Sequence, residues 1–169
     1  HPSGKYLASA SYTDAGISFF ELNQDGTLKN RKQLLEFIDH SILTDRQKEA
    51  HMHSSYFSGD GKYLFAPDLG ADKIRVFSVN EHQEGLRLHI NEPLTVQSAA
   101  AAGPRHLAFH PSQKFAYCAE EMSGTVAAYT LNNGLLTLID RYFSYSQVFN
   151  RYSSADIHIT KDGKFLYVS

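Results

Sequence analysis

The stretch that decides the fold is HPSQKFAYCAEEMSGTVAAYTLNNGLLTLIDRY, residues 110–142. It contains three runs typical of β-strands, residues 114–121, 125–131 and 135–142. Short turn sequences, Met-Ser-Gly and Asn-Asn-Gly, separate these runs. A fourth run, residues 105–110, comes just before a proline turn. Four short strands joined by tight turns predict one four-stranded antiparallel sheet.

The same pattern occurs four times along the chain. Each copy has a turn, a lysine and an aromatic-rich strand. The copies read HPSGKYLASA, SGDGKYLFAP, HPSQKFAYCA and TKDGKFLYVS. The shared lysines are Lys5, Lys62, Lys114 and Lys164, so successive copies are 57, 52 and 50 residues apart. A strand-rich repeat of about 50 residues is the signature of a β-propeller, whose blades pack only against their neighbours.

We therefore predict an all-β chain that forms one partial β-propeller domain over residues 1–169. Its blades are expected at roughly residues 1–40, 51–95, 104–142 and 154–169. Propellers close with about four to eight blades, and this chain accounts for about three blades plus the start of another. We expect an internal piece of a longer ring that self-associates through its open blade edges. The alternative is a small complete sheet, which would leave two blade faces and several strand edges uncovered.

Composition excludes several classes of protein. The net charge of −2 argues against a nucleic-acid binder. No apolar run approaches the roughly 18 residues of a membrane span, so no membrane partner is expected. The single cysteine, Cys118, excludes an internal disulfide framework and is predicted to pack in the core. The expected location is the cytoplasm.

Differences between the copies point to a functional site. When the copies are aligned on the shared lysine, His53, Arg105 and Ala155 occupy equivalent positions of the repeat, here called one slot. This slot lies where the inner strand of each blade begins, at the rim of the central channel. Blade geometry does not need a large polar side chain there, because the third copy has alanine. His53 and Arg105 are therefore predicted to serve a function.

Two more side chains are expected at the same channel mouth. Glu121 is the only carboxylate in its slot, where the other copies have Leu69 and Tyr12. His51 lies two residues before His53, so both should point the same way on an extended chain. Histidine can exchange a proton near neutral pH, arginine binds anions, and a glutamate can carry a second proton. This group of residues has the parts for acid–base chemistry on an anion.

Structural roles are the alternatives for these residues. Glu121 could form only an ion pair with Arg105. His106 and His110 are better explained as hydrogen-bonding groups between blades. Glu120 and Asp68, one slot earlier, are expected to face the other way or to cap the following turn. The His-x-His pair with a carboxylate could also hold a metal ion, but an arginine beside it would repel the cation, so neither a metal nor a cofactor is expected.

Two segments carry a resemblance to a known family. RQKEAHMHSSYFSGDGKYLFAPDLGADKIRVFSVN and GPRHLAFHPSQKFAYCAEEMSGTVAAY resemble the lactonase family of seven-bladed β-propellers. That family includes the 6-phosphogluconolactonase and 3-carboxy-cis,cis-muconate lactonising types. Its Pro-His-x-His pattern is here Ala50 to His53, and its Asn-Glu pair is here Glu120 and Glu121. Its arginine in Gly-Pro-Arg-His corresponds to Arg105.

The resemblance implies a fold, an activity and a set of site residues. It implies a seven-bladed parent and a lactonase acting on a small anionic sugar-acid lactone, with 6-phosphogluconolactone as the leading substrate. The catalytic residues would be His53, Arg105 and Glu121, and His51 and Arg105 would bind substrate. The alternatives are a carboxymuconate cyclase-type cycloisomerase that uses the same proton carriers and a non-enzymatic propeller that binds a ligand or a protein.

Overall fold

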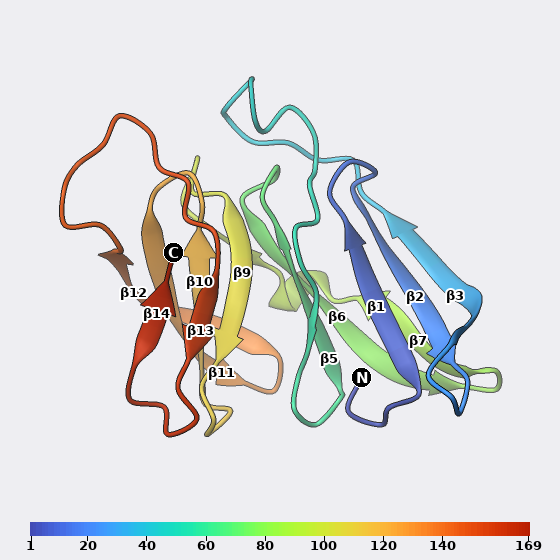
Figure 1. Ribbon diagram of the computed structural model, residues 1–169. Helices are drawn as coiled ribbons and strands as arrows, with labels where there is room; N and C mark the ends of the chain where they lie inside the picture. Colours follow the sequence, from blue (N-terminus) through green and yellow to red (C-terminus); the bar gives the residue numbers. More distant parts are fainter.

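The computed structural model describes all residues from 1 to 169 and is built almost entirely of β-strands. Four antiparallel sheets stand side by side in chain order, from β1–β3 at one side to β13–β14 at the other (Figure 1). The only helical segment is one short 3-10 turn, η1 (Glu92–Leu94). The predicted all-β class with antiparallel blades is confirmed.

The strands follow the order of the repeat. The first sheet contains β1 (Tyr6–Ser11), β2 (Gly16–Leu22) and β3 (Leu28–Glu36). The second contains β4 (Tyr56–Phe57), β5 (Tyr63–Asp68), β6 (Lys73–His82) and β7 (Gly85–Ile90), with β8 (Val96–Gln97) paired to β6. The third contains β9 (Pro104–Phe109), β10 (Phe115–Glu120), β11 (Thr125–Asn132) and β12 (Leu135–Phe143). The last pair is β13 (Ile157–Ile159) and β14 (Leu166–Val168).

The inner strand of the second sheet is very short. It is β4, which contains only Tyr56 and Phe57. The chain before β4 still lies beside β5, because Met52 forms an isolated bridge with Asp68 and the backbone of His53 donates to Pro67 O at 2.9 Å. Residues 51–55 are therefore held beside β5 without being a regular strand.

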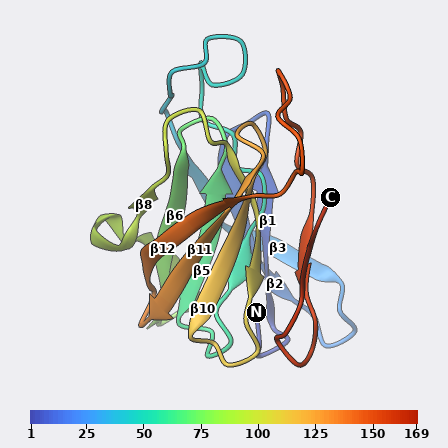
Figure 2. The ribbon, with the colours of Figure 1, turned by 90° about the vertical axis from the view of Figure 1, so that its left-hand side faces the viewer.

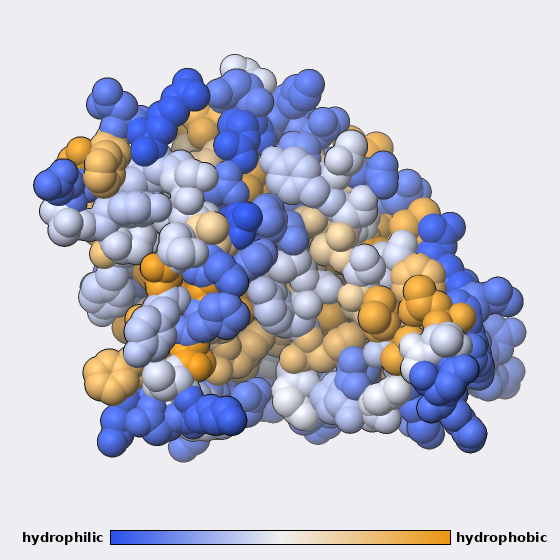
Figure 3. Space-filling view, in the orientation of Figure 1, coloured by the Kyte–Doolittle hydropathy of each residue, from blue (hydrophilic) through white to orange (hydrophobic).

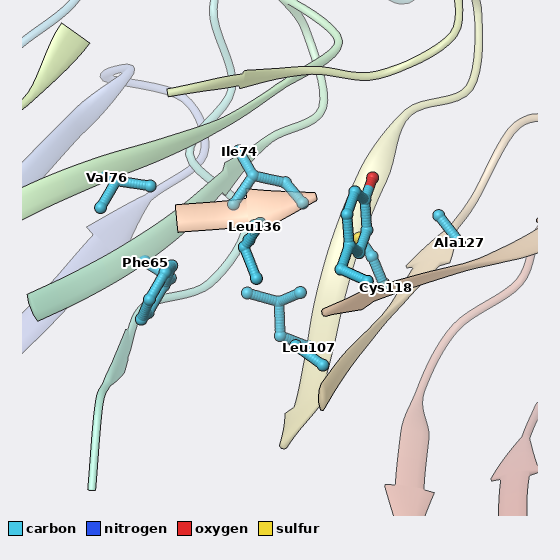
Figure 4. Packing of buried hydrophobic residues seen from close by; sticks show 9 residues of the cluster. Phe65, Ile74, Val76, Leu107, Cys118, Ala127 and Leu136 are labelled. Carbon is cyan, nitrogen blue, oxygen red and sulfur yellow. The ribbon is translucent and has the colours of Figure 1, made fainter. Parts of the chain in front are cut away.

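Apolar side chains fill the space between successive sheets. Phe65, Ile74 and Val76 of the second sheet lie in one cluster with Leu107 and Cys118 of the third (Figure 4). Fully burying one such side chain contributes about 1.5–3 kcal/mol to stability. Cys118 is completely buried there, which agrees with its predicted place in the core. A similar cluster joins the first and second sheets.

Turn residues also connect neighbouring blades. His1 Nδ1 hydrogen-bonds with Ser3, and its Nε2 hydrogen-bonds with Gly61 O of the next blade at 3.1 Å. His110 repeats this arrangement, since its Nδ1 lies 2.8 Å from Ser112 Oγ and its ring lies against Gly163. A side chain on that glycine would collide with the imidazole. His110 thus contacts the next blade through its ring, but its side-chain hydrogen bonds stay within its own turn, so the hydrogen bond expected between blades is not formed.

The connection between β3 and β4 rises above one end of the sheets (Figures 1 and 2). Its central part forms a single turn, in which the backbone of Gln47 donates to Leu43 O at 2.6 Å. The side chain of Gln47 is fully buried and donates to Leu69 O at 2.9 Å. This hydrogen bond therefore holds the β3–β4 connection against the end of the second sheet.

Candidate active site

The structure brings the three predicted catalytic residues together. His53 precedes β4, Arg105 lies in β9, and Glu121 directly follows β10. Arg105 Nε donates to Glu121 Oε2 at 3.0 Å. His53 Nε2 lies 3.9 Å from the same carboxylate oxygen. The carboxylate of Glu121 therefore stands between a guanidinium and an imidazole that come from different blades.

A β-bulge places Arg105 in this group. In the pairing of β9 with β10, His106 is opposite Ala119 and Pro104 is opposite Glu120. Arg105 is the extra residue between these pairs. A bulge bends the strand locally and re-aims side chains. Arg105 Nη1 also donates to the backbone oxygen of Ala155, so its guanidinium is tied to the next blade as well.

The sequence interpretation missed one residue of the site, Arg46. Its Nη2 donates to Glu121 Oε1 at 2.7 Å. Hydrogen bonds with Glu121 and Tyr12 raise the pKa of Arg46 above its ordinary value. Arg46 lies in the β3–β4 connection, outside the repeated turn-and-strand pattern, so comparing equivalent positions of the repeats does not reach it.

Asp72 positions two of the segments that carry site residues. Its Oδ2 accepts from Ser41 Oγ at 2.6 Å, which holds the β3–β4 connection. Its Oδ1 accepts from the backbone of Gly103 at 2.8 Å, just before β9. Asp72 is fully buried and has a positive φ of 53°. One carboxylate thus links the loop that carries Arg46 to the strand that carries Arg105.

His53 lies in an environment that disfavours its charged form. Burial, together with the smaller effect of the positive charges of Arg105 and His106, lowers its pKa from 6.5 to about 4. The ring is therefore neutral at pH 7 and has one bare nitrogen that can accept a proton. Its Nδ1 is buried without a hydrogen-bond partner, whereas its Nε2 faces Glu121.

His51 lies on the same side of the chain as His53, and both contact one tyrosine. The ring of His51 stacks on Tyr12, with ring centroids 4.2 Å apart. The ring of His53 meets Tyr12 edge-on at 5.5 Å. His51 Nδ1 hydrogen-bonds with the backbone oxygen of Tyr12 at 2.9 Å. Only the other ring nitrogen of His51 is left for the substrate contact predicted for it.

His106 forms the wall of the site toward the last pair of strands. Its ring centroid lies 5.2 Å from that of His53. Its Nδ1 lies 2.8 Å from Asp156 Oδ1, and His158 Nε2 lies 2.8 Å from Asp156 Oδ2. Hydrogen bonds with these two histidines hold the pKa of Asp156 well below its usual range. The hydrogen bond that was expected between blades is therefore present, and it also orients a ring that touches His53.

The two acidic residues one slot earlier do not face the site. Glu120 is fully buried and accepts from Thr125 Oγ1 at 2.6 Å and from Arg141 Nε at 3.1 Å. Asp68 accepts from Arg75 and from the backbone of Ala71 in the following turn. Asp68 caps that turn as expected, and Glu120 forms a separate ion pair with the partly exposed Arg141.

The charges of the site suit an anion. Two guanidinium groups surround one carboxylate, which leaves one positive charge beside a neutral imidazole. Guanidinium groups bind carboxylates and phosphates through paired, charge-assisted hydrogen bonds. No group of three or more His, Cys, Asp or Glu side chains has the geometry to hold a metal ion. The single helical turn is far too short to cross a membrane.

Comparison with known proteins identifies the family. The family model described as "Lactonase, 7-bladed beta-propeller" matches residues 1–169. A Formosa agariphila protein named 6-phosphogluconolactonase is 43% identical over 173 residues, which are 99% of this chain and 47% of the relative. A protein of the same name from Pectobacterium carotovorum is 33% identical over 98% of this chain and 47% of its own length.

Solved structures show the same relationship. A Bacteroides fragilis protein described as a candidate 6-phosphogluconolactonase superposes with a TM-score of 0.91 at 36% identity, over 98% of this chain and 47% of the other. The periplasmic gluconolactonase of Pseudomonas aeruginosa superposes with a TM-score of 0.90 at 32% identity and the same coverage. This chain spans about half the length of the relatives it matches. It belongs to the lactonase family of seven-bladed β-propellers.

Proposed function

We propose that the protein to which this chain belongs hydrolyses a sugar-acid lactone, with 6-phosphogluconolactone as its substrate. The observation that carries the proposal is the convergence of His53, Arg105 and Glu121 at one end of the inner strands. Arg105 contacts Glu121 at 3.0 Å, and His53 lies 3.9 Å from the same oxygen. Relatives named 6-phosphogluconolactonase support the choice of substrate.

In this mechanism His53 is the general base. A water molecule attacks the lactone carbonyl while neutral His53 takes its proton. Arg105 donates to the oxyanion that forms on the carbonyl oxygen. The ring C–O bond then breaks, and His53 returns the proton to the leaving alkoxide. One water is consumed, and the product is an open hydroxy acid.

Glu121 supports both partners in this scheme. It holds the guanidinium of Arg105 through Oε2. Its negative charge also stabilises the imidazolium that His53 becomes when it takes the proton. A bound anionic substrate acts in the same direction and raises the pKa of His53 from about 4 toward neutrality. His53 therefore becomes a stronger base only when the substrate is bound.

Partial exposure favours an enzyme over a purely structural cluster. The side chains of His53, Arg105 and Glu121 are 18%, 22% and 10% exposed. A structural ion pair has no need to face solvent, whereas a catalytic group must reach its substrate. The three groups are close enough together to act on one small molecule.

The test is hydrolysis of 6-phosphogluconolactone by the full-length protein. The rate is measured as acid release in a pH-stat, and the spontaneous hydrolysis is subtracted. We expect His53→Ala, Arg105→Ala and Glu121→Gln each to lower kcat/KM by roughly 10²-fold or more. Lys114→Gln, an exposed change at the far turn of the third blade, should leave the rate unchanged. Wild-type protein without turnover above background would overturn the activity, and isomerisation of a muconolactone would indicate a cycloisomerase instead.

The proposed location is the cytoplasm. A phosphorylated sugar acid is too highly charged to cross a bilayer unaided, so the enzyme must lie in the compartment where its substrate forms. One structural neighbour is described as periplasmic, which makes the compartment a property to be measured. Cell fractionation of the source organism distinguishes the two locations.

A further inference from the structure

Arg46 is the most exposed charged group of the site. Its side chain is 44% exposed, compared with 22% for Arg105 and 10% for Glu121. Both arginines contact the same carboxylate, but on different oxygens. Arg46 therefore stands on the solvent side of Glu121, at the outer edge of the site, while Arg105 stands deeper.

The two guanidinium groups differ in how they are held. Arg105 donates through Nε to Glu121 and through Nη1 to the backbone oxygen of Ala155, so it is tied to two blades. Arg46 contacts Glu121 through Nη2 and also interacts with Tyr12. A guanidinium carries five N–H groups, so these contacts leave several donors of Arg46 facing solvent. Such a group can take a new anion without leaving Glu121.

We infer, on the basis of the proposed function, that Arg46 binds the phosphate group of the substrate and so makes the enzyme selective for the phosphorylated lactone. One carboxylate group separates Arg46 from His53, since Glu121 Oε1 contacts Arg46 at 2.7 Å and Oε2 lies 3.9 Å from His53 Nε2. A lactone ring with a phosphate at its far end has two polar groups. Its carbonyl fits beside His53 and Arg105, and its phosphate fits at the exposed Arg46.

The position of Arg46 is built into the fold. Its neighbour Gln47 is fully buried and donates to Leu69 O, and Ser41 of the same connection donates to Asp72. The loop is thus fastened on both sides of the arginine. A fixed guanidinium recognises a phosphate at a lower entropic cost than a free one.

A purely positioning role is the competing explanation. In that case Arg46 only holds Glu121, and its loss would disturb the catalytic carboxylate for every substrate. The phosphate role instead requires an effect that depends on the phosphate. Two lactones that differ only in this group, 6-phosphogluconolactone and glucono-δ-lactone, therefore distinguish the two roles.

The experiment uses the full-length protein as wild type, Arg46→Gln, Arg46→Lys and Lys48→Gln. Lys48 is exposed, lies two residues away and carries the same charge, so its change controls for general electrostatics. For Arg46→Gln we expect KM for 6-phosphogluconolactone to rise about 10- to 100-fold, with a small change in kcat. The kcat/KM for glucono-δ-lactone should fall at least tenfold less than that for 6-phosphogluconolactone. Arg46→Lys should restore part of the loss, and Lys48→Gln should resemble wild type.

Product binding gives a readout that does not need turnover. Calorimetry should show 6-phosphogluconate binding that weakens in Arg46→Gln by a similar factor, with an unchanged midpoint of urea unfolding. Equal losses for both lactones, or no loss for either, would overturn the phosphate role while leaving the lactonase activity in place. Wild-type protein that hydrolyses neither lactone would overturn the proposed function, and absence of 6-phosphogluconate binding to it would overturn the role of Arg46.

Discussion

Gly70 lies directly against the backbone carbonyl of Glu49, so closely that a Cβ atom on Gly70 would overlap the carbonyl oxygen. Gly70 belongs to the turn between β5 and β6, and Glu49 belongs to the connection that carries Arg46 and leads into His51 and His53. Because the obstacle is backbone rather than a flexible side chain, it cannot rotate away. This contact sets how near the connection comes to the second sheet.

Replacing Gly70 with alanine should therefore damage both stability and activity. We expect Gly70→Ala to lower the free energy of unfolding by about 2 kcal/mol or more, since the added methyl group must push the backbone of residues 49–51 away. Lactone hydrolysis should fall at least tenfold, because the same shift moves Arg46 and His53. Urea unfolding and the pH-stat assay on the full-length protein measure the two effects.

The matched control is Gly26→Ala. Gly26 has a φ of +84° and open space around it, so alanine there costs about 1–2 kcal/mol through backbone strain alone. It lies in the turn between β2 and β3, away from the site, and the activity should persist. A Gly70→Ala protein as stable and active as wild type would contradict the importance of this contact.

The environment of His53 predicts an unusual pH dependence. Its pKa is about 4 instead of 6.5, so the free enzyme keeps a neutral base well below pH 6.5. We expect kcat/KM to stay level from pH 7 to about 5 and to fall only near pH 4. Arg105→Gln removes a positive charge beside His53 and should therefore raise the pKa of His53. The fall in the residual kcat/KM of this variant at acidic pH should then begin at a higher pH than in wild type. A wild-type limb between pH 6 and 7 would show that His53 is not the base.

The same group links stability to pH. Between about pH 4 and 6.5 the unfolded chain binds a proton at His53 that the folded protein does not, so the free energy of unfolding should rise with pH across this window. His53→Ala should reduce that slope. Urea unfolding of both proteins at pH 4.5 and pH 7 isolates the contribution of His53, since the other titrating groups are shared. Identical slopes would argue against the lowered pKa.

Cys118 should be unreactive in the folded protein. It is fully buried in the core between the second and third sheets, and burial raises the pKa of its thiol. Only the thiolate reacts with alkylating or disulfide reagents. We expect no labelling under native conditions and one labelled thiol per copy of this chain in urea. Rapid labelling of the native protein would show that the core opens easily.

The 169-residue chain studied alone should self-associate. Apolar side chains are exposed over the β13–β14 pair (Figure 3), and Phe143, Phe165 and Tyr167 are 72%, 61% and 62% exposed. A groove lined mostly by apolar residues runs between the third sheet and this pair. Open faces of this kind favour association. Solution scattering across a concentration series tests the expectation, Tyr167→Lys should weaken association, and a compact monomer at every concentration would refute it.

Much of the fold could be predicted from the repeat. Turn residues and a shared lysine recur about every 50 residues, and short runs between them specify antiparallel strands. The same spacing placed His53 and Arg105 in one slot, and the structure brings both to Glu121. These features are readable because they are local and periodic, so each copy of the repeat serves as a reference for the others.

Only the tertiary structure revealed the remaining features of the site. Arg46 comes from a connection outside the repeat, and it reaches Glu121 across 75 positions of sequence. The bulge at Arg105 appears only when β9 pairs with β10. The lowered pKa of His53 arises from burial and from charges on the neighbouring blade. Local sequence specifies strands and turns, whereas charge, burial and register depend on which segments meet in space, and those contacts form only when the blades pack together.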